Sequence, residues 1–104
     1  MTDYRVVFAP EANKQLIALY DYIADAASAG VAQSYTDGVV SYCESLAQFP
    51  YRGNRRDELL PGLRITHYRK RTIIAIVVND EAQEVNITGF WHGGRQYESA
   101  FEVE

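Results

Sequence analysis

The chain has 104 residues, of which 47% are hydrophobic and 23% are charged, and its formal net charge is −4 at pH 7. This composition predicts one globular domain over residues 1–104, with a tail from about residue 93 and enough apolar residues for a core. The negative net charge disfavours non-specific binding to nucleic acid, which needs a basic surface.

The first predicted elements are a short strand and a helix. Residues 4–9 (YRVVFA) are rich in β-branched and aromatic side chains, which predicts a strand that ends before Pro10. Proline suits the first position of a helix, because the N–H that it lacks would be unpaired there. From Pro10 to about Ala27 the apolar residues recur at helical spacing, which predicts one amphipathic helix.

A second helix is predicted after a break at residues 28–30 (SAG). From Ala32 to Phe49 apolar residues recur at alternating steps of three and four, and Pro50 ends the pattern. Since three or four residues connect the two stripes, the helices are expected to form an antiparallel hairpin.

Three strands are predicted in the second half of the chain, at residues 63–68, 72–78 and 84–91. Residues 69–71 (RKR) lie between the first two as a charged turn. In the last strand, Phe90, Trp91 and His92 must place aromatic groups on both faces, because side chains alternate along a strand. The order β-α-α-β-β-β predicts an α+β domain, in which an N-terminal strand and an antiparallel helical hairpin precede a three-stranded antiparallel sheet.

Positive charge is concentrated between Phe49 and Arg71. This segment carries a net charge of +5, whereas the other residues sum to −9. Such a segment can bind a nucleic acid, dock an acidic protein or form a solvated face. Its basic residues are seven of the ten in the chain: Arg52, Arg55, Arg56, Arg64, Arg69, Lys70 and Arg71.

Signals for catalysis are sparse. Cys43 lies on the apolar stripe of the second helix, so we interpret it as a small buried hydrophobe. No hydrolase, nucleotide-binding or metalloprotease motif is present. RNA cleavage is the one reaction that the residue types could serve, because it needs a base, an acid and cations around a phosphate. Residues of these types are Arg64, Arg69, Arg71, His92, Arg95 and Tyr97, and the four arginines could lie near the ends of neighbouring strands.

Metal ions, cofactors and membranes are not expected. One cysteine and two histidines make a poor set of metal ligands, and a single cysteine forms no internal disulfide. The N-terminal sequence is not that of a signal peptide, and no apolar run reaches the length of a membrane span. We therefore expect a cytoplasmic protein.

Several short segments between residues 4 and 97 form a pattern by their order and spacing. These are Phe8-Ala9-Pro10-Glu11-Ala12, Tyr22-Ile23-Ala24, the spacing Tyr35…Cys43…Leu46-Ala47…Phe49-Pro50…Gly53, Leu59-Leu60-Pro61-Gly62-Leu63-Arg64 and His92-Gly93-Gly94-Arg95. Together they resemble the ParE-like toxins of the RelE/ParE superfamily. The fold for which this family is known agrees with the predicted order of elements.

The resemblance implies a toxin of a bacterial type II toxin–antitoxin pair, active in growth inhibition and plasmid stabilisation. Such a toxin is neutralised by a ParD-like antitoxin in a tight hetero-oligomeric complex. ParE-like members are associated with DNA gyrase and RelE-like members with cleavage of mRNA on the ribosome. A pI of about 5.1 and only two lysines favour the ParE side. We therefore expect a gyrase inhibitor without catalytic residues.

Two alternatives remain beside the gyrase inhibitor. One is a RelE-like ribosome-dependent endoribonuclease. The other is a toxin-derived protein of weak activity that acts mainly as the partner of its antitoxin.

Two sets of residues are predicted to bind proteins. The target is expected to contact Arg64, His92, Arg95 and Tyr97, and the antitoxin to contact Arg64, Arg69 and Arg71. An acidic antitoxin segment that folds on binding would match the basic stretch. The apolar stripes of the two helices are expected to leave a groove for a partner helix. Direct binding of nucleic acid is not expected.

Overall fold

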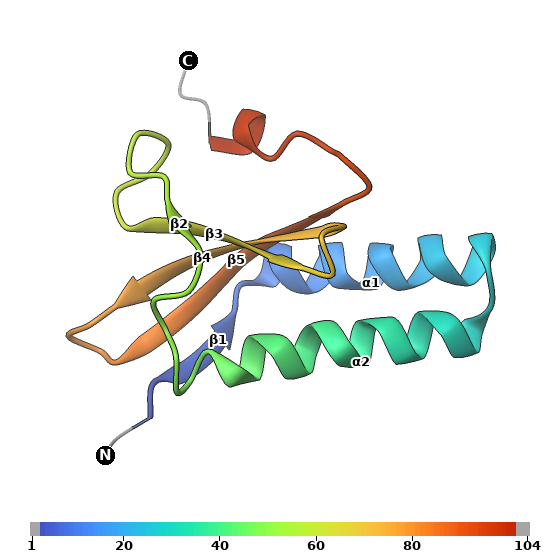
Figure 1. Ribbon diagram of the computed structural model, residues 1–104, viewed down its shortest axis with the longest axis horizontal. Coiled ribbons are helices and arrows are strands. Elements are labelled where there is room, and N and C mark those ends of the chain that lie inside the picture. Colours follow the sequence, from blue (N-terminus) through green and yellow to red (C-terminus); the bar gives the residue numbers. More distant parts are fainter. Residues whose placement is uncertain (1–2, 102–104) are drawn as a thin grey trace.

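The computed structural model describes residues 3–101 and contains the predicted order of elements. Strand β1 (Arg5–Phe8) precedes the helices α1 (Pro10–Ala26) and α2 (Ala29–Ser45). They are followed by β2 (Asn54–Arg55), β3 (Leu63–Tyr68), β4 (Thr72–Asn79), β5 (Glu84–His92) and the short 3-10 helix η1 (Glu98–Phe101). Figure 1 shows α1 and α2 running side by side beside the sheet.

The strands form one five-stranded mixed sheet in the order β1-β5-β4-β3-β2. The predicted α+β fold is confirmed, and β3, β4 and β5 form the predicted antiparallel meander. The sheet is larger than predicted, because β1 adds to β5 in parallel and β2 adds to β3. Since β2 has only two residues, it carries no alternation of apolar and polar residues from which a strand could be predicted.

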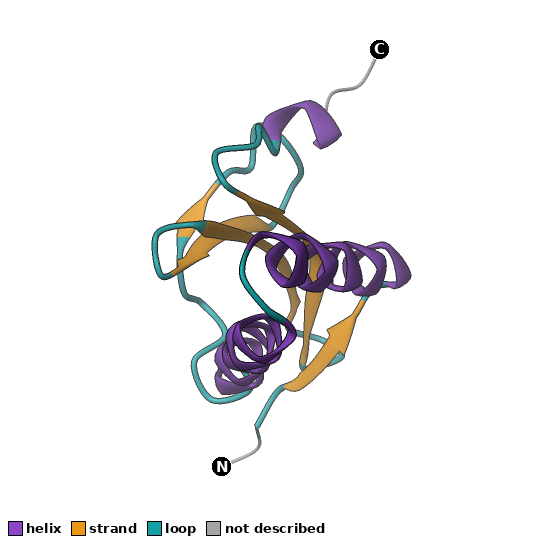
Figure 2. Ribbon diagram, turned by 90° about the vertical axis from the view of Figure 1, so that its right-hand side faces the viewer, coloured by secondary structure: helices purple, strands orange, loops and turns teal. Residues whose placement is uncertain are grey.

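The connection between the helices is shorter than predicted. The hydroxyl of Ser28 accepts a hydrogen bond from the Val31 N–H at 3.1 Å, which makes Ser28 the N-cap of α2. The second helix therefore starts before Gly30 and not after it. Figure 2 views the two helices nearly end on and shows them beside each other. The predicted antiparallel hairpin is confirmed.

The C-terminal end of α2 differs from the prediction. The helix ends at Ser45, and the following turn is closed by shorter-range bonds such as Leu46 N–H to Cys43 O at 3.0 Å. Phe49 therefore lies outside the helix and is 57% exposed. Its predicted place on the buried stripe is wrong, because the tighter turn rotates it away from the core.

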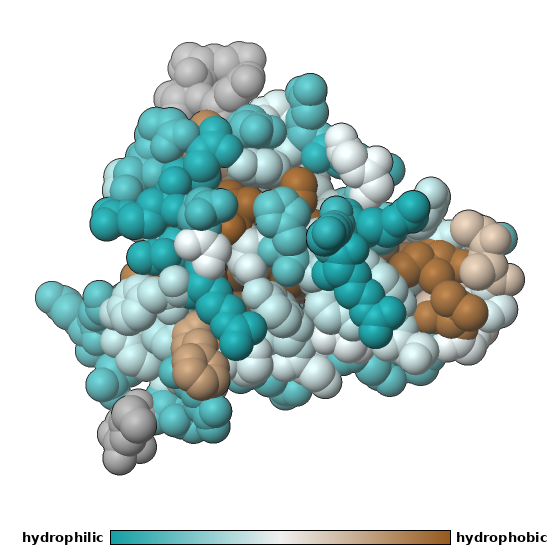
Figure 3. All heavy atoms as spheres, in the orientation of Figure 1, coloured by the Kyte–Doolittle hydropathy of each residue, from teal (hydrophilic) through white to brown (hydrophobic). Residues whose placement is uncertain are grey.

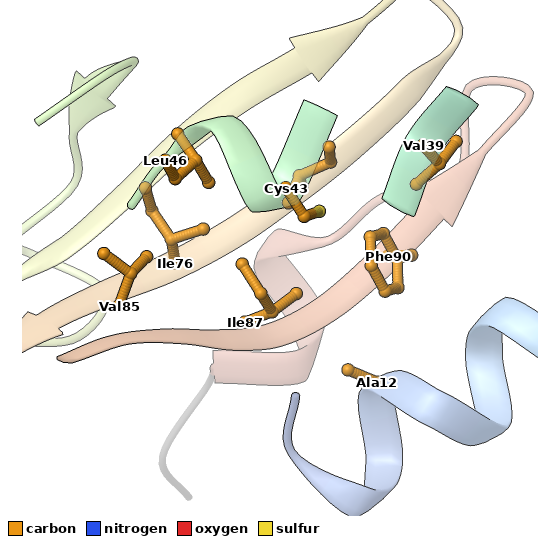
Figure 4. Packing of buried hydrophobic residues seen from close by; sticks show 9 residues of the cluster. Ala12, Val39, Cys43, Leu46, Ile76, Val85, Ile87 and Phe90 are labelled. Carbon is orange, nitrogen blue, oxygen red and sulfur yellow. The ribbon is translucent and has the colours of Figure 1, made fainter. Parts of the chain in front are cut away.

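The main core lies between the two helices and one face of the sheet. In Figure 4, Val39 and Cys43 of α2, and Leu46 directly after it, point toward Ile76 of β4 and toward β5. Each of these four residues is fully buried. Burial of Cys43 confirms its interpretation as a small core residue.

The other face of the sheet has a second apolar cluster. Phe90 belongs to the main core, whereas Trp91 packs with Leu63, Ile65 and Tyr97 on the opposite face. The prediction that the end of β5 serves both faces is therefore confirmed. As a result, the sheet separates His92, which contacts the helices, from Tyr97, which packs against Trp91.

Helix α1 covers the part of β5 that extends past β1. Pairing between β1 and β5 ends at Ile87, and further along β5 the Phe90 N–H donates to Oε1 of Gln15 at 2.8 Å. A backbone N–H that would otherwise be unpaired is thereby satisfied by a side chain of α1. This bond fixes α1 against the C-terminal half of β5.

Helix α2 approaches β3 closely at Gly38. A Cβ atom at this position would lie 2.1 Å from the Tyr68 hydroxyl oxygen and 3.0 Å from the ring carbon that bears it. Glycine inside a helix costs about 1 kcal/mol relative to alanine. The close contact with Tyr68 explains why the helix has glycine here.

We predict that Gly38→Ala destabilises the domain by roughly 1 kcal/mol, because an overpacking cost of about 1–3 kcal/mol exceeds the gain in helix propensity. Chemical denaturation of Gly38→Ala, Tyr68→Phe and the double variant measures the coupling. Removal of the Tyr68 hydroxyl should recover about half of the loss or more. Strictly additive effects of the two substitutions would contradict the proposed clash.

Candidate functional site

One end of the sheet contains four of the predicted site residues. The turn between β3 and β4 carries Arg69 and Arg71, and β5 ends at His92 beside this turn. The Gly93 N–H donates a hydrogen bond to the Arg71 carbonyl oxygen at 3.1 Å. This bond connects the segment after β5 to the β3–β4 turn. Arg95 follows and is exposed. Figure 3 shows strongly hydrophilic side chains gathered over the β3–β4 turn.

The β3–β4 turn has an unfavourable backbone conformation for its sequence. Arg69 has φ +53° and Lys70 has φ +61°, and the Arg71 N–H donates to the Tyr68 carbonyl oxygen at 3.3 Å. A turn with two positive φ angles favours Asn-Gly, and left-handed backbone costs other residues about 1–2 kcal/mol each. Among residues 3–101, no ion pair joins a carboxylate to Arg69, Lys70 or Arg71. The turn therefore exposes cations that no carboxylate neutralises, and its two positive φ angles lower the stability of the fold.

His92 is fixed by a chain of hydroxyl groups. The Thr72 hydroxyl oxygen lies 2.8 Å from Nδ1 of His92 and 2.7 Å from the Tyr35 hydroxyl oxygen, and Thr72 is fully buried. The rings of Tyr22 and Tyr35 pack edge-on against the imidazole, with centroids 6.0 Å and 5.7 Å away. Burial lowers the pKa of His92 below its ordinary value, and the Arg71 cation lowers it further. Both effects favour the neutral form of the His92 imidazole.

A cavity of about 340 Å³ lies between α1 and the end of β5. Its lining is mostly apolar and aromatic, with a few polar groups and no carboxylate, which is the usual character of a binding pocket. The lining residues are Gln15, Ala18, Leu19, Tyr22, Phe90, Trp91, His92, Gly93 and Arg95. Two of the predicted target-binding residues, His92 and Arg95, thus share one pocket.

Arg64 lies apart from this pocket. In the register of β3 and β4, Arg64 pairs with Ile76. Arg69 lies five residues further along the chain, which corresponds to roughly 17 Å of extended strand. The Arg64 guanidinium donates to the carbonyl oxygens of Tyr51 at 3.0 Å and Gly53 at 3.3 Å. Arg64 thus connects β3 to the segment between α2 and β2. Its contact with a target or an antitoxin stays a prediction.

Tyr97 lies on the opposite face of the sheet from His92. Its side chain is 9% exposed and packs against Trp91, with ring centroids 6.1 Å apart. The Arg56 guanidinium donates to the Tyr97 hydroxyl and also pairs with Glu98 at 3.8 Å. These contacts anchor the C-terminal segment to the sheet. Contact of Tyr97 with a target therefore stays a prediction that needs movement of this segment.

The described residues offer no reactive thiol and no metal site. Burial raises the pKa of the Cys43 thiol to about 12, and the nearby Glu44 carboxylate adds to the effect, so the thiol is unreactive. Within residues 3–101, no three His, Cys, Asp or Glu side chains are grouped so as to bind a metal ion. No helix in the same range has the length and apolar character needed to cross a membrane.

Sequence reasoning missed two residues that line the pocket, Gln15 and Tyr22, and two that position His92 through hydrogen bonds, Tyr35 and Thr72. Tyr22 is a large aromatic residue off the apolar stripe of the first helix, and its 61% exposure matches that position. Thr72 opens a strand that is otherwise apolar, which is a signal for a specific polar contact. Tyr35 lies on the apolar stripe of the second helix, and the sequence does not reveal that its hydroxyl group reaches Thr72.

We predict that Arg71→Gln raises the pKa of His92, because removal of the nearby cation favours the imidazolium form. The burial effect remains, so the pKa should stay below 6.5. NMR titration of the imidazole in a His67→Gln background gives the value from a single histidine. Lys70→Gln removes the same charge from the same turn as a matched control. An equal rise in both variants would contradict a specific effect of Arg71.

Comparison with known proteins places this geometry in a family. The family model described as ParE toxin of the type II toxin–antitoxin system parDE matches residues 6–97. A comparison with curated protein sequences gives no significant match. The matched range extends from β1 through the pocket to Tyr97 and so includes every predicted site residue.

Solved structures share the fold. The chromosomal ParDE system of Pseudomonas aeruginosa contains a chain that is 19% identical, with a TM-score of 0.73 over 86% of this chain and 95% of that one. The RelBE2 complex of Mycobacterium tuberculosis gives 23% identity and a TM-score of 0.64 over 91% and 97%. The isolated RelE toxin of Escherichia coli gives 18% identity and a TM-score of 0.56 over 93% and 92%. By the family match, this chain belongs to the ParE toxins of type II toxin–antitoxin systems.

Proposed function

We propose that this protein is a cytoplasmic toxin that inhibits growth by binding DNA gyrase and is silenced by a ParD-like antitoxin. The observation that carries the proposal is the family match over residues 6–97, which spans nearly the whole domain. The proposal has two parts: a target-binding end of the sheet and an antitoxin-binding face of the helices.

The dispersal of the candidate residues favours binding over catalysis. Cleavage of RNA requires a base, an acid and cations within reach of one phosphate. Here Tyr97 lies on the opposite face of the sheet from His92, and Arg64 lies roughly 17 Å along β3 from Arg69. A protein target can contact separated residues at once, whereas one phosphate cannot. The endoribonuclease alternative is therefore less well supported.

The target surface is proposed to be the end of the sheet that carries Arg69, Arg71, His92 and Arg95. Four cations lie there without a carboxylate partner among the described residues: Arg69, Lys70, Arg71 and Arg95. Unpaired cations attract an acidic partner surface and speed its association. Retaining them in a strained turn is consistent with selection for binding.

The antitoxin is proposed to occupy the outer groove between α1 and α2. This groove has a volume of about 320 Å³ and is mostly apolar, with Ile17 64% exposed. Its lining residues are Leu16, Ile17, Tyr20, Thr36, Asp37 and Val40. Apolar residues at this spacing suit the apolar face of an amphipathic helix. Acidic residues of the same antitoxin would reach Arg69 and Arg71.

We predict that purified protein causes cleaved DNA to accumulate with purified gyrase, and that Arg95→Gln lowers this activity roughly tenfold. Arg55→Gln is the matched control, because Arg55 is exposed and does not line the pocket. Its guanidinium pairs with the Asp57 carboxylate at 2.9 Å. Growth inhibition on expression should follow the same order.

The outcomes separate the three functions. Cleavage of mRNA in a translating extract without an effect on gyrase would replace the proposal by the endoribonuclease. Absence of both activities, with tight binding to the antitoxin, would favour the toxin-derived partner.

We predict that Ile17→Glu weakens binding of a ParD-like antitoxin by at least about tenfold, because it buries an unpaired carboxylate in an apolar contact. Ser34→Glu, an equally charged change at an exposed position of α2 outside the groove, should leave affinity unchanged. Calorimetric titration of the two variants measures the difference. Equal affinities for both variants would show that the antitoxin does not bind in this groove.

A further inference from the structure

We propose that the cavity between α1 and β5 accepts a carboxylate group of a protein partner, bound by Nε2–H of His92 and by the guanidinium of Arg95. This inference rests on the proposed function, because it uses the same end of the sheet as the target surface. It adds the chemical group that is recognised and the residues that orient His92.

The hydrogen-bond chain determines which nitrogen of His92 carries the proton. The Thr72 hydroxyl has one hydrogen and two neighbours, Tyr35 and His92. If Tyr35 donates to Thr72, then Thr72 donates to Nδ1 and every hydrogen in the chain has an acceptor. The reverse direction leaves the Tyr35 hydroxyl hydrogen without an acceptor among the described residues. The chain therefore favours the tautomer with hydrogen on Nε2.

The orientation of the ring makes this hydrogen available to a ligand. Nδ1 points toward Thr72, which is fully buried, so Nε2 lies on the opposite side of the ring. The edge-on packing of Tyr22 and Tyr35 restricts rotation of the imidazole. His92 thus presents a neutral donor at the cavity it lines, and Thr72 and Tyr35 act as positioning residues.

Other donors converge on the same cavity. Arg95 lines it, and Gln15 uses its amide oxygen to accept from the Phe90 N–H, which leaves the amide NH₂ group free to donate. No carboxylate lines the cavity. Donors and a positive charge, without a carboxylate in the lining, favour an anionic ligand. The apolar walls at Leu19 and Trp91 suit a carboxylate that is attached to an aromatic or aliphatic group.

Charge around the cavity favours a single carboxylate over a nucleic-acid strand. Asp21 and Asp25 are exposed on α1 on either side of Tyr22 in sequence. A single nucleic-acid strand carries one charge about every 3.4 Å and needs a continuous basic path, and the exposed surface of α1 beside Tyr22 carries carboxylates and no cation between Lys14 and the end of the helix. One carboxylate that projects from a protein surface avoids them.

The test uses three small probes and NMR of the full-length protein. N-acetylphenylalanine carries a carboxylate beside an aromatic ring, N-acetylphenylalaninamide lacks the charge, and phenyl phosphate carries a different anion. Saturable shifts of the His92 imidazole and Arg95 guanidinium signals are expected with the carboxylate probe, and much weaker shifts with the amide. Equal response to the amide, tighter binding of phenyl phosphate or no response at His92 would overturn the proposal.

Variants test the assigned roles. Arg95→Gln should lower the affinity for N-acetylphenylalanine roughly tenfold. The control Arg55→Gln should bind this probe with the same affinity as the unsubstituted protein. Thr72→Val should change the ¹⁵N pattern of His92 away from a single Nε2–H tautomer, and Thr72→Ser should restore it. An unchanged tautomer in Thr72→Val would overturn the positioning role. If Thr72→Val does not fold, Arg95→Gln still decides whether the carboxylate is bound at this cavity.

Failure of this inference is distinguishable from failure of the proposed function. The probe experiments contain neither gyrase nor antitoxin, so carboxylate binding without gyrase poisoning would reject only the proposed target. Gyrase poisoning without carboxylate binding would reject only the recognised group.

Discussion

The alternation of side chains at the end of β5 is the constraint on which the rest of the structure depends. Consecutive residues of a strand point to opposite faces, so Phe90 enters the main core, Trp91 enters the second cluster and His92 returns to the helical face. Each face then needs its own cover. The helices cover one, and the segment anchored by Tyr97 covers the other. The candidate pocket forms where α1 meets the end of this strand.

The contact between α2 and the sheet combines two kinds of packing. Val39 and Cys43 are fully buried in the apolar main core. Tyr35 and Tyr42, about one turn or less away on the same helix, form hydroxyl pairs at 2.7 Å with Thr72 and Thr66 of the sheet. An unpaired buried hydroxyl would cost about 1–3 kcal/mol, so each pair limits the positions that the helix can take. Directional bonds of this kind suit a site that must fix the orientation of His92.

The positive charge of the segment between Phe49 and Arg71 has two uses. Arg55 and Arg56 are paired with carboxylates, and Arg64 donates to backbone carbonyl groups. These three arginines stabilise the fold of the long connection between α2 and β3. Arg52 lies over the rings of Tyr42 and Phe49. The turn at Arg69 and Arg71 offers cations that neither a described carboxylate nor a described backbone carbonyl group pairs with. The net charge of the segment therefore overstates the charge available to a partner.

The sequence by itself determined the fold class, the helical hairpin, the meander of β3, β4 and β5 and the family resemblance, because periodicity and punctuation by Pro10 and Pro50 are local signals. Only the tertiary structure decided the extent of the sheet and the composition of the site. Parallel addition of β1 depends on a partner almost eighty residues away, since Arg5 is in register with Glu84. Grouping His92 with Tyr35, and separating it from Arg64 and Tyr97, likewise depends on sheet register and on the face that each residue occupies, which residue types alone do not encode.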